Sequence, residues 1–131
     1  MGYIPNDPAR TGFYVLLNRH FNIVAFMYPL GYPERMNSIL RTENFDSWIR
    51  KLKDKKGKAR IVERIRSAER GNFGDCSSVE QGVSEMRVHF GPGYRVYFTQ
   101  IDDVVYVLLG GGSKGSQKRD VTNAQKLARS I

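Results

Sequence analysis

The stretch SEMRVHFGPGYR, residues 84–95, alternates apolar and polar side chains on both sides of a GPG turn at residues 91–93. This pattern is typical of an antiparallel hairpin with one buried and one solvated face. We expect Phe90 to lie opposite Tyr94 across a three-residue loop. That register makes two further apolar pairs, Val88 with Val96 and Met86 with Phe98. The hairpin therefore predicts a sheet packed on a core through one face.

The same register places His89 opposite Arg95 and Arg87 opposite Tyr97 on the solvated face. A slip of one residue would bury these four side chains and expose the apolar set. Two guanidinium groups, an imidazole and a phenol suit the binding of a phosphodiester and the movement of a proton beside it. This face is the candidate site that the residues themselves predict.

These four residues also have structural interpretations, which the sequence leaves open. Arg87 and Arg95 could form ion pairs with Glu85 or Asp120, and Tyr97 could be a half-buried sheet residue. A histidine alone would be weak evidence for a catalytic role, and the expected position of His89 beside Arg95 makes that evidence stronger.

The composition favours one basic domain. The chain has 131 residues, with 21 Lys and Arg against 13 Asp and Glu, a net charge of +8 and a pI near 9.8. Such a surplus favours an acidic partner, of which nucleic acid is the commonest, although an ordinary basic protein would look the same. Neither apolar run, 13–17 or 23–30, approaches the roughly 20 residues that a membrane span needs.

The few cysteines and histidines argue against disulfide and metal chemistry. Cys76 is the only cysteine, which excludes an intrachain disulfide and agrees with a reducing cytoplasm. His20 and His89 lie far apart in the sequence, so we expect no metal site and no cofactor.

The first 35 residues differ from the rest, since they hold four of the five prolines and show little periodicity. We expect residues 1–35 to be an N-terminal extension, disordered or a non-native start, and residues 36–131 to form the folded domain. The alternative is a genuine N-terminal hairpin with FYVLL and IVAFMY as its strands.

From Met36 onward the pattern is regular. The expected elements are a strand over 38–41, helices over 43–53 and 58–70, an edge strand over 75–80, hairpin strands over 84–90 and 94–100, a buried strand over 104–109 and a helix from about 121. Thr42 is the expected N-cap of the first helix, where Phe45, Trp48, Ile49 and Leu52 repeat as a core stripe. The fold class is α+β: a twisted antiparallel sheet with two N-terminal helices on one face and a short C-terminal helix.

The glycine run at 110–112 lacks the spacing of a phosphate-binding P-loop. We expect it to end the buried strand and to let the chain pass close to a neighbour, which leaves Lys114 near the polar face of the sheet.

Four segments, TENFDSWIRKLKD, KARIVERIRSAERGNFGDC, GVSEMRVHFGPGYRVYF and VVYVLLGGGSKGSQKRD, resemble in order and spacing the addiction-module killer proteins. These are a HigB-like branch of the RelE/ParE toxin superfamily. The resemblance covers about residues 36–129 and implies a RelE-like fold. It also implies a toxin of a type II toxin–antitoxin system, held inactive by a small helix-turn-helix antitoxin, that works in the cytoplasm. The best-known toxins of this fold cut mRNA in the ribosomal A site without a metal, whereas a sister branch poisons DNA gyrase.

The resemblance assigns roles to particular residues. Arg95 and Arg87 match basic residues of two strand motifs, His89 falls at a basic or proton-transfer position, and Lys114 matches the lysine of the C-terminal segment. Val121 lies where some of these toxins carry a catalytic tyrosine, so His89 becomes the leading proton-transfer candidate. The expected RNA-binding residues are Tyr97, Arg60, Arg64, Lys58 and Lys118, although the helix cations could equally be a solvated face.

The expected reaction uses the ribose 2′-hydroxyl as nucleophile, His89 as base and the cations as partners of the phosphate. Between two arginines, we expect the imidazole to favour its neutral form. Two other functions stay open: a gyrase-targeting toxin of the same fold and a nonenzymatic nucleic-acid-binding module.

Overall fold

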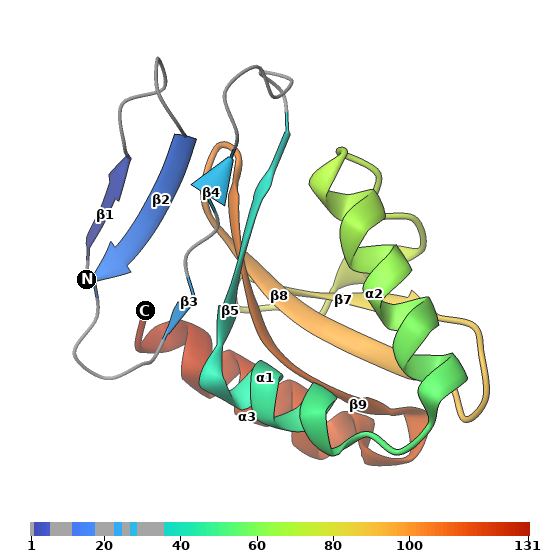
Figure 1. Ribbon diagram of the computed structural model, residues 1–131. Helices are drawn as coiled ribbons and strands as arrows, with labels where there is room; N and C mark the ends of the chain where they lie inside the picture. Colours follow the sequence, from blue (N-terminus) through green and yellow to red (C-terminus); the bar gives the residue numbers. More distant parts are fainter. Residues whose placement is uncertain (1, 6–11, 18–22, 25–26, 29–35) are drawn as a thin grey trace.

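The computed structural model describes residues 2–5, 12–17, 23–24, 27–28 and 36–131 (Figure 1). From Met36 the elements are β5 (Ser38–Thr42), α1 (Glu43–Lys51), α2 (Lys55–Glu69), β6 (Cys76–Ser78), β7 (Val83–Val88), β8 (Tyr94–Asp102), β9 (Val105–Ser113), a 3₁₀ turn (Lys114–Ser116) and α3 (Gln117–Arg129). Their order confirms the predicted sequence of strands and helices, and the fold is α+β.

Four short strands precede this part: β1 (Gly2–Pro5), β2 (Gly12–Leu17), β3 (Ile23–Val24) and β4 (Met27–Tyr28). Both segments of the alternative N-terminal hairpin contain strands, and β2 pairs with β4. β2 also pairs with β1, and β3 joins the main sheet beside β5. The rest of the predicted extension lies outside the described residues. A domain boundary at Met36 therefore stays a prediction.

The main sheet has the strand order β3-β5-β9-β8-β7-β6. Strands β6 to β9 form an antiparallel meander, but β5 and β9 run parallel. The prediction of a wholly antiparallel sheet is therefore wrong at this pair. The helix pair carries the chain across the sheet, and the meander then returns β9 beside β5 in the same direction.

Capping side chains fix where the two N-terminal helices begin. Thr42 Oγ1 accepts a hydrogen bond from the Phe45 backbone at 3.2 Å, as predicted for the N-cap of α1. Asp54 Oδ1 accepts from the Gly57 backbone at 2.9 Å and caps α2. Because of this second cap, α2 begins three residues before the predicted start at Lys58.

Helices cover both faces of the sheet. On one face, α1 and α2 pack through Phe45, Ile61 and Ile65 against a buried cluster that includes Met86 and Val96. On the other, α3 covers a second cluster that holds Leu40, Val83, Tyr97, Val107 and Ala124. The two N-terminal helices thus share one face as predicted, whereas α3 packs on the face that was expected to be solvated (Figure 1).

The hairpin register differs from the prediction by two residues. Val88 lies opposite Tyr94 and Arg87 lies opposite Arg95. Five residues, 89–93, connect Val88 to Tyr94 in place of the predicted three, and Gly91 and Gly93 turn the chain at φ of +56° and +80°. Because side chains alternate with a period of two, the shift keeps every residue on its predicted face.

The glycine run does not end β9, as predicted, but lies within it. A Cβ at Gly111 would overlap the Trp48 ring, and one at Gly112 would overlap Asp120. A Cβ at Gly110 would come within 2.7 Å of the Asn44 amide nitrogen. The glycines are therefore where α1 and α3 approach β9 most closely, which confirms the predicted close approach to a neighbour.

Candidate functional site

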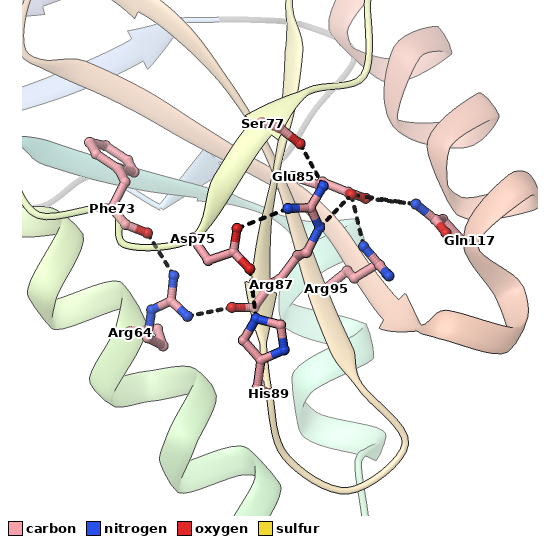
Figure 2. Close-up of polar contacts among 9 residues, drawn as sticks. All are labelled: Arg64, Phe73, Asp75, Ser77, Glu85, Arg87, His89, Arg95 and Gln117. Carbon is pink, nitrogen blue, oxygen red and sulfur yellow. Dashed lines mark hydrogen bonds and ion pairs between the residues drawn. The ribbon is translucent and has the colours of Figure 1, made fainter.

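A buried carboxylate joins the two hairpin arginines. Glu85 in β7 has only 2% of its side chain exposed, and its Oε1 accepts from Arg95 Nη1 at 2.8 Å and Arg87 Nε at 3.2 Å. Gln117, at the start of α3, donates to Glu85 Oε2 at 3.1 Å. Figure 2 shows the carboxylate between these three groups. The structural interpretation, in which both arginines pair with Glu85, is thus confirmed.

A second carboxylate links Arg87 to His89. Asp75 Oδ1 accepts from Arg87 Nη1 at 2.8 Å, and Asp75 Oδ2 lies 2.6 Å from His89 Nε2. Arg87 Nη2 also donates to Ser77 Oγ at 2.8 Å, so every guanidinium nitrogen of Arg87 has a partner. Arg87 therefore bridges two carboxylates in this structure and does not present an unpartnered pair of guanidinium nitrogens to a phosphate.

Arg64 fixes the segment that carries Asp75. Its guanidinium reaches from α2 to the backbone carbonyls of Phe73, at 2.6 Å, and Arg87 (Figure 2). The Arg87 backbone N–H donates to the Asp75 carbonyl at 2.9 Å. These contacts hold Asp75 against β7, so Arg64, predicted to bind RNA, has its donors directed at the protein.

The charged groups of this cluster shift the pKa values of Asp75 and Arg87. The hydrogen bond from His89 is the main cause that lowers the pKa of Asp75, with Arg87 adding to it. Asp75 in turn raises the pKa of Arg87. The nearest charged partner of His89 is thus a carboxylate. The predicted position of His89 between two arginines is wrong, because β7 ends at Val88 and His89 lies in the loop, where its ring meets Asp75.

Tyr97 does not lie on a solvated face. Its side chain is buried under α3, and its hydroxyl has no hydrogen-bond partner among the described residues. Burial, followed by the charges of Glu85 and Asp120, raises the pKa of Tyr97 to about 12. The predicted binding of RNA by Tyr97 is therefore wrong, because α3 packs on this face of the sheet and buries the ring.

The remaining predicted cations surround the hairpin turn or lie on helices. Lys114 is exposed, and its backbone N–H donates to the Gly93 carbonyl at 2.9 Å. Arg60 of α2 lies 5.1 Å from the centre of the Phe90 ring. Lys118 is exposed on the first turn of α3, and Lys58 is half-buried on α2. Lys114 and Arg60 thus lie beside the turn that follows His89.

Sequence reasoning missed Asp75 and Gln117 as members of this cluster. Asp75 stands at the start of a short edge strand, where no periodicity marks it. Gln117 enters only because α3 folds over the polar face. The pairing of Glu85 with Arg87 could have been predicted from the sequence, since the two residues lie two positions apart and therefore share one face of the strand. Among the described residues, no three His, Cys, Asp or Glu side chains gather in a way that could hold a metal ion.

No helix in the described part of the chain combines the length and the apolarity that a membrane span needs. The cysteine at 76 is exposed at the start of β6.

A curated protein of Haemophilus influenzae, described only as uncharacterized, is similar to this chain. The two are 44% identical over 93 residues, which make up 71% of this chain and 94% of that protein. No protein-family model matches the chain, and no solved structure matches it. At this identity and coverage, the chain belongs to the family of the uncharacterized Haemophilus influenzae protein.

Proposed function

We propose that the protein is a toxin of a type II toxin–antitoxin system, with a RelE-like fold of the HigB-like branch. In this proposal it works in the cytoplasm as a ribosome-dependent endoribonuclease that cuts mRNA without a metal ion. The sequence resemblance to addiction-module killer proteins supplies the class of protein. The paired His89 and Asp75 supply the chemistry.

The observation that carries the proposal is the 2.6 Å contact between His89 Nε2 and Asp75 Oδ2. His89 is 73% exposed, so its ring can reach a substrate in solution. A neutral imidazole that donates from Nε2 to Asp75 keeps its lone pair on Nδ1. Asp75 therefore orients His89 and leaves one nitrogen ready to take a proton.

The reaction would proceed by attack of a ribose 2′-oxygen on the adjacent phosphorus. His89 Nδ1 takes the 2′-hydroxyl proton, and the bond from phosphorus to the 5′-oxygen breaks. The leaving 5′-oxygen takes a proton from a water molecule, which gives a 2′,3′-cyclic phosphate and a 5′-hydroxyl end, and His89 then releases its proton to the hydroxide so formed. The imidazolium formed on His89 is stabilised by the Asp75 carboxylate beside it.

Cations around the turn would stabilise the charge on the phosphate. Lys114 and Arg60 flank the turn and are exposed, and Lys118 is exposed on α3. Arg95 is 13% exposed: its Nη1 binds Glu85 and its Nε is buried, which leaves Nη2 as the nitrogen that could meet a phosphate. The net charge of +8 would attract the protein to ribosomal RNA and mRNA over a longer range.

The partner expected in the resting cell is a cognate antitoxin, with a helix-turn-helix DNA-binding domain, encoded beside this protein. Expression of the chain alone should stop growth, and co-expression of its small neighbour should restore it. Purified protein added to translating ribosomes should then cut mRNA within codons, which mapping of transcript ends would show. Normal growth on strong induction of folded protein would contradict the proposal.

A gyrase-targeting toxin without nuclease activity is the second candidate. The observation that favours it is that Arg87 and Arg95 are neutralised by Glu85 and Asp75. Such a cluster could hold the fold together without chemistry. If induction of the protein relaxes plasmid DNA and leaves transcript ends unchanged, gyrase is the target instead.

A further inference from the structure

A cleft of about 450 Å³ lies between α1 and α3, along the edge of β9. Residues of α1, including Asn44, Trp48 and Lys51, form one wall, and Arg119 and Asn123 of α3 belong to the other. This volume lies within the range of pockets that bind small molecules. Nothing in the proposed chemistry of His89 and Asp75 uses this cleft.

The floor of the cleft is the edge of a strand. Among the described strands, the pairing of β5 with β9 ends at Leu108, so β9 continues with its second edge open. The Lys114 backbone N–H donates to the Gly93 carbonyl, which fixes the alternation of hydrogen bonds between β8 and β9. By that alternation, the N–H and C=O of Gly111 point away from β8 and toward the cleft.

The walls offer a flat ring and amide groups. A Cβ at Gly111 would overlap the Trp48 ring, so the indole packs directly against the strand. The Asn44 side chain donates to the Leu109 carbonyl at 2.8 Å, which holds the amide in place and leaves its oxygen as an acceptor. Asn123 presents a second, exposed amide from α3.

Charge at the cleft favours an anionic ligand. Lys51 and Arg119 lie among its lining residues and are both exposed. Arg119 Nε lies 3.6 Å from Asp120 Oδ1, the one carboxylate among the described lining residues, so the positive charge of Lys51 remains without a carboxylate of the cleft to balance it. Ser116 lines the cleft, whereas the next residue, Gln117, donates to Glu85 in the arginine cluster. The 3₁₀ turn thus connects this cleft to the candidate site.

We propose that the cleft is a binding subsite for a single unpaired nucleobase. The base stacks on Trp48, its polar edge meets the Gly111 backbone and the asparagine amides, and its phosphate lies toward Lys51 and Arg119. An extended peptide could also add to an open strand edge, but it would not use the aromatic ring and the two cations together. The inference rests on the proposed function in one respect: it makes the bound RNA the source of the base.

Trp48 is the only tryptophan of the chain, so its fluorescence reports on the cleft directly. We would titrate the full chain with the four nucleoside 5′-monophosphates up to about 10 mM, with ribose 5-phosphate and inorganic phosphate as controls that lack a base. The expected result is saturable quenching by at least one nucleotide and none by the controls. Asn123→Ala should weaken that binding about 3- to 10-fold, because one hydrogen bond is lost. Lys126→Ala, on the same helix outside the cleft, should leave it unchanged.

The affinities of a nucleotide and of a short single strand, measured side by side, identify the source of the base. A single-stranded tetranucleotide that binds about tenfold or more tighter than its monophosphate would support RNA as the source, since neighbouring phosphates add contacts. Equal affinities would support a nucleobase site that takes free nucleotides.

Three results would overturn the inference. They are quenching by ribose 5-phosphate equal to that by nucleotides, no quenching by any nucleotide, and a shift of the Gly111 amide resonance by a short extended peptide but not by nucleotides. The proposed function fails separately. If the parent protein cuts no mRNA on ribosomes while nucleotides still quench Trp48, the subsite stands alone. If mRNA is cut and no nucleotide binds, only the subsite is wrong.

Discussion

Glu85 is the buried counter-ion of Arg95: the two side chains are 2% and 13% exposed, and their charged atoms lie 2.8 Å apart. Each strand of the hairpin contributes one member of the pair. The contact therefore fixes the polar face of the sheet from inside and sets the position of Arg87, which binds the same oxygen.

Removal of Glu85 should destabilise the protein strongly. Glu85→Ala leaves two arginines without their buried partner, and such changes typically cost about 3–5 kcal/mol. Urea denaturation followed by circular dichroism measures the loss. Glu63→Ala removes an exposed ion pair with Arg70, at 3.6 Å, and should cost less than about 1 kcal/mol. Similar losses of unfolding free energy in the two variants would show that the buried Glu85 carboxylate contributes no more to stability than an exposed one.

The close packing of α1 on β9 predicts a sharp difference between two glycines. Gly111→Ala should cost about 1–3 kcal/mol, because the added methyl overlaps the Trp48 ring. At Gly115 the nearest atom to an added Cβ is 3.8 Å away, so Gly115→Ala should change stability by less than about 1 kcal/mol. Thermal unfolding of the two variants tests this, and equal melting temperatures would place Trp48 elsewhere.

Tyr97 makes stability at alkaline pH depend on a buried phenol. Its pKa is raised to about 12 by burial, so the folded state keeps the proton that the unfolded state releases near pH 10. Stability should therefore fall as the pH rises from about 10 toward 12. Tyr97→Phe should reduce that fall without abolishing it, because the hydrogen bond to Asp54 raises the pKa of Tyr94 as well. It should leave any cleavage activity intact, because the Tyr97 hydroxyl is buried. If a stably folded Tyr97→Phe protein lost its cleavage activity, Tyr97 would have to take part in the reaction.

The Asp75 carboxyl should titrate below its ordinary range, because His89 and Arg87 stabilise the carboxylate. The resulting stabilisation is present above the ordinary carboxyl pKa and is lost as the pH falls through the lowered one, below about pH 4. In His89→Ala, carbon-detected NMR should show the Asp75 pKa moving up toward its ordinary value. An unchanged titration would mean that the two side chains do not meet in solution.

The hairpin shows how much of this fold the sequence predicts. Alternation put every hairpin residue on its face, because the period of two survives a register shift of two. Thr42 and the apolar stripe of α1 marked the first helix for local reasons that sequence carries. The register itself depended on the turn at Gly91 and Gly93, whose conformation alternation does not specify.

Tertiary packing decided what the sequence left open. Nothing local shows that α3 covers Tyr97, or that Asp75 folds back onto Arg87 and His89. Trp48 shares the helical stripe of Phe45, but Phe45 is 1% exposed whereas Trp48 is only partly buried and lines a cleft. Periodicity marks a helix face without saying where that face ends.

The role of His89 as general base is tested by measuring mRNA cleavage on purified ribosomes by the parent protein and by His89→Ala, across a range of pH. We expect cleavage by the variant to fall about 10²- to 10⁴-fold and to lose its pH dependence near neutrality. Asp75→Asn should fall less, because it misorients the imidazole without removing it, and Lys126→Ala should match the parent. Ribosome binding should persist in His89→Ala, since the remaining cations still attract RNA. Cleavage by His89→Ala at the parent rate and with the parent pH profile would show that His89 is not the general base.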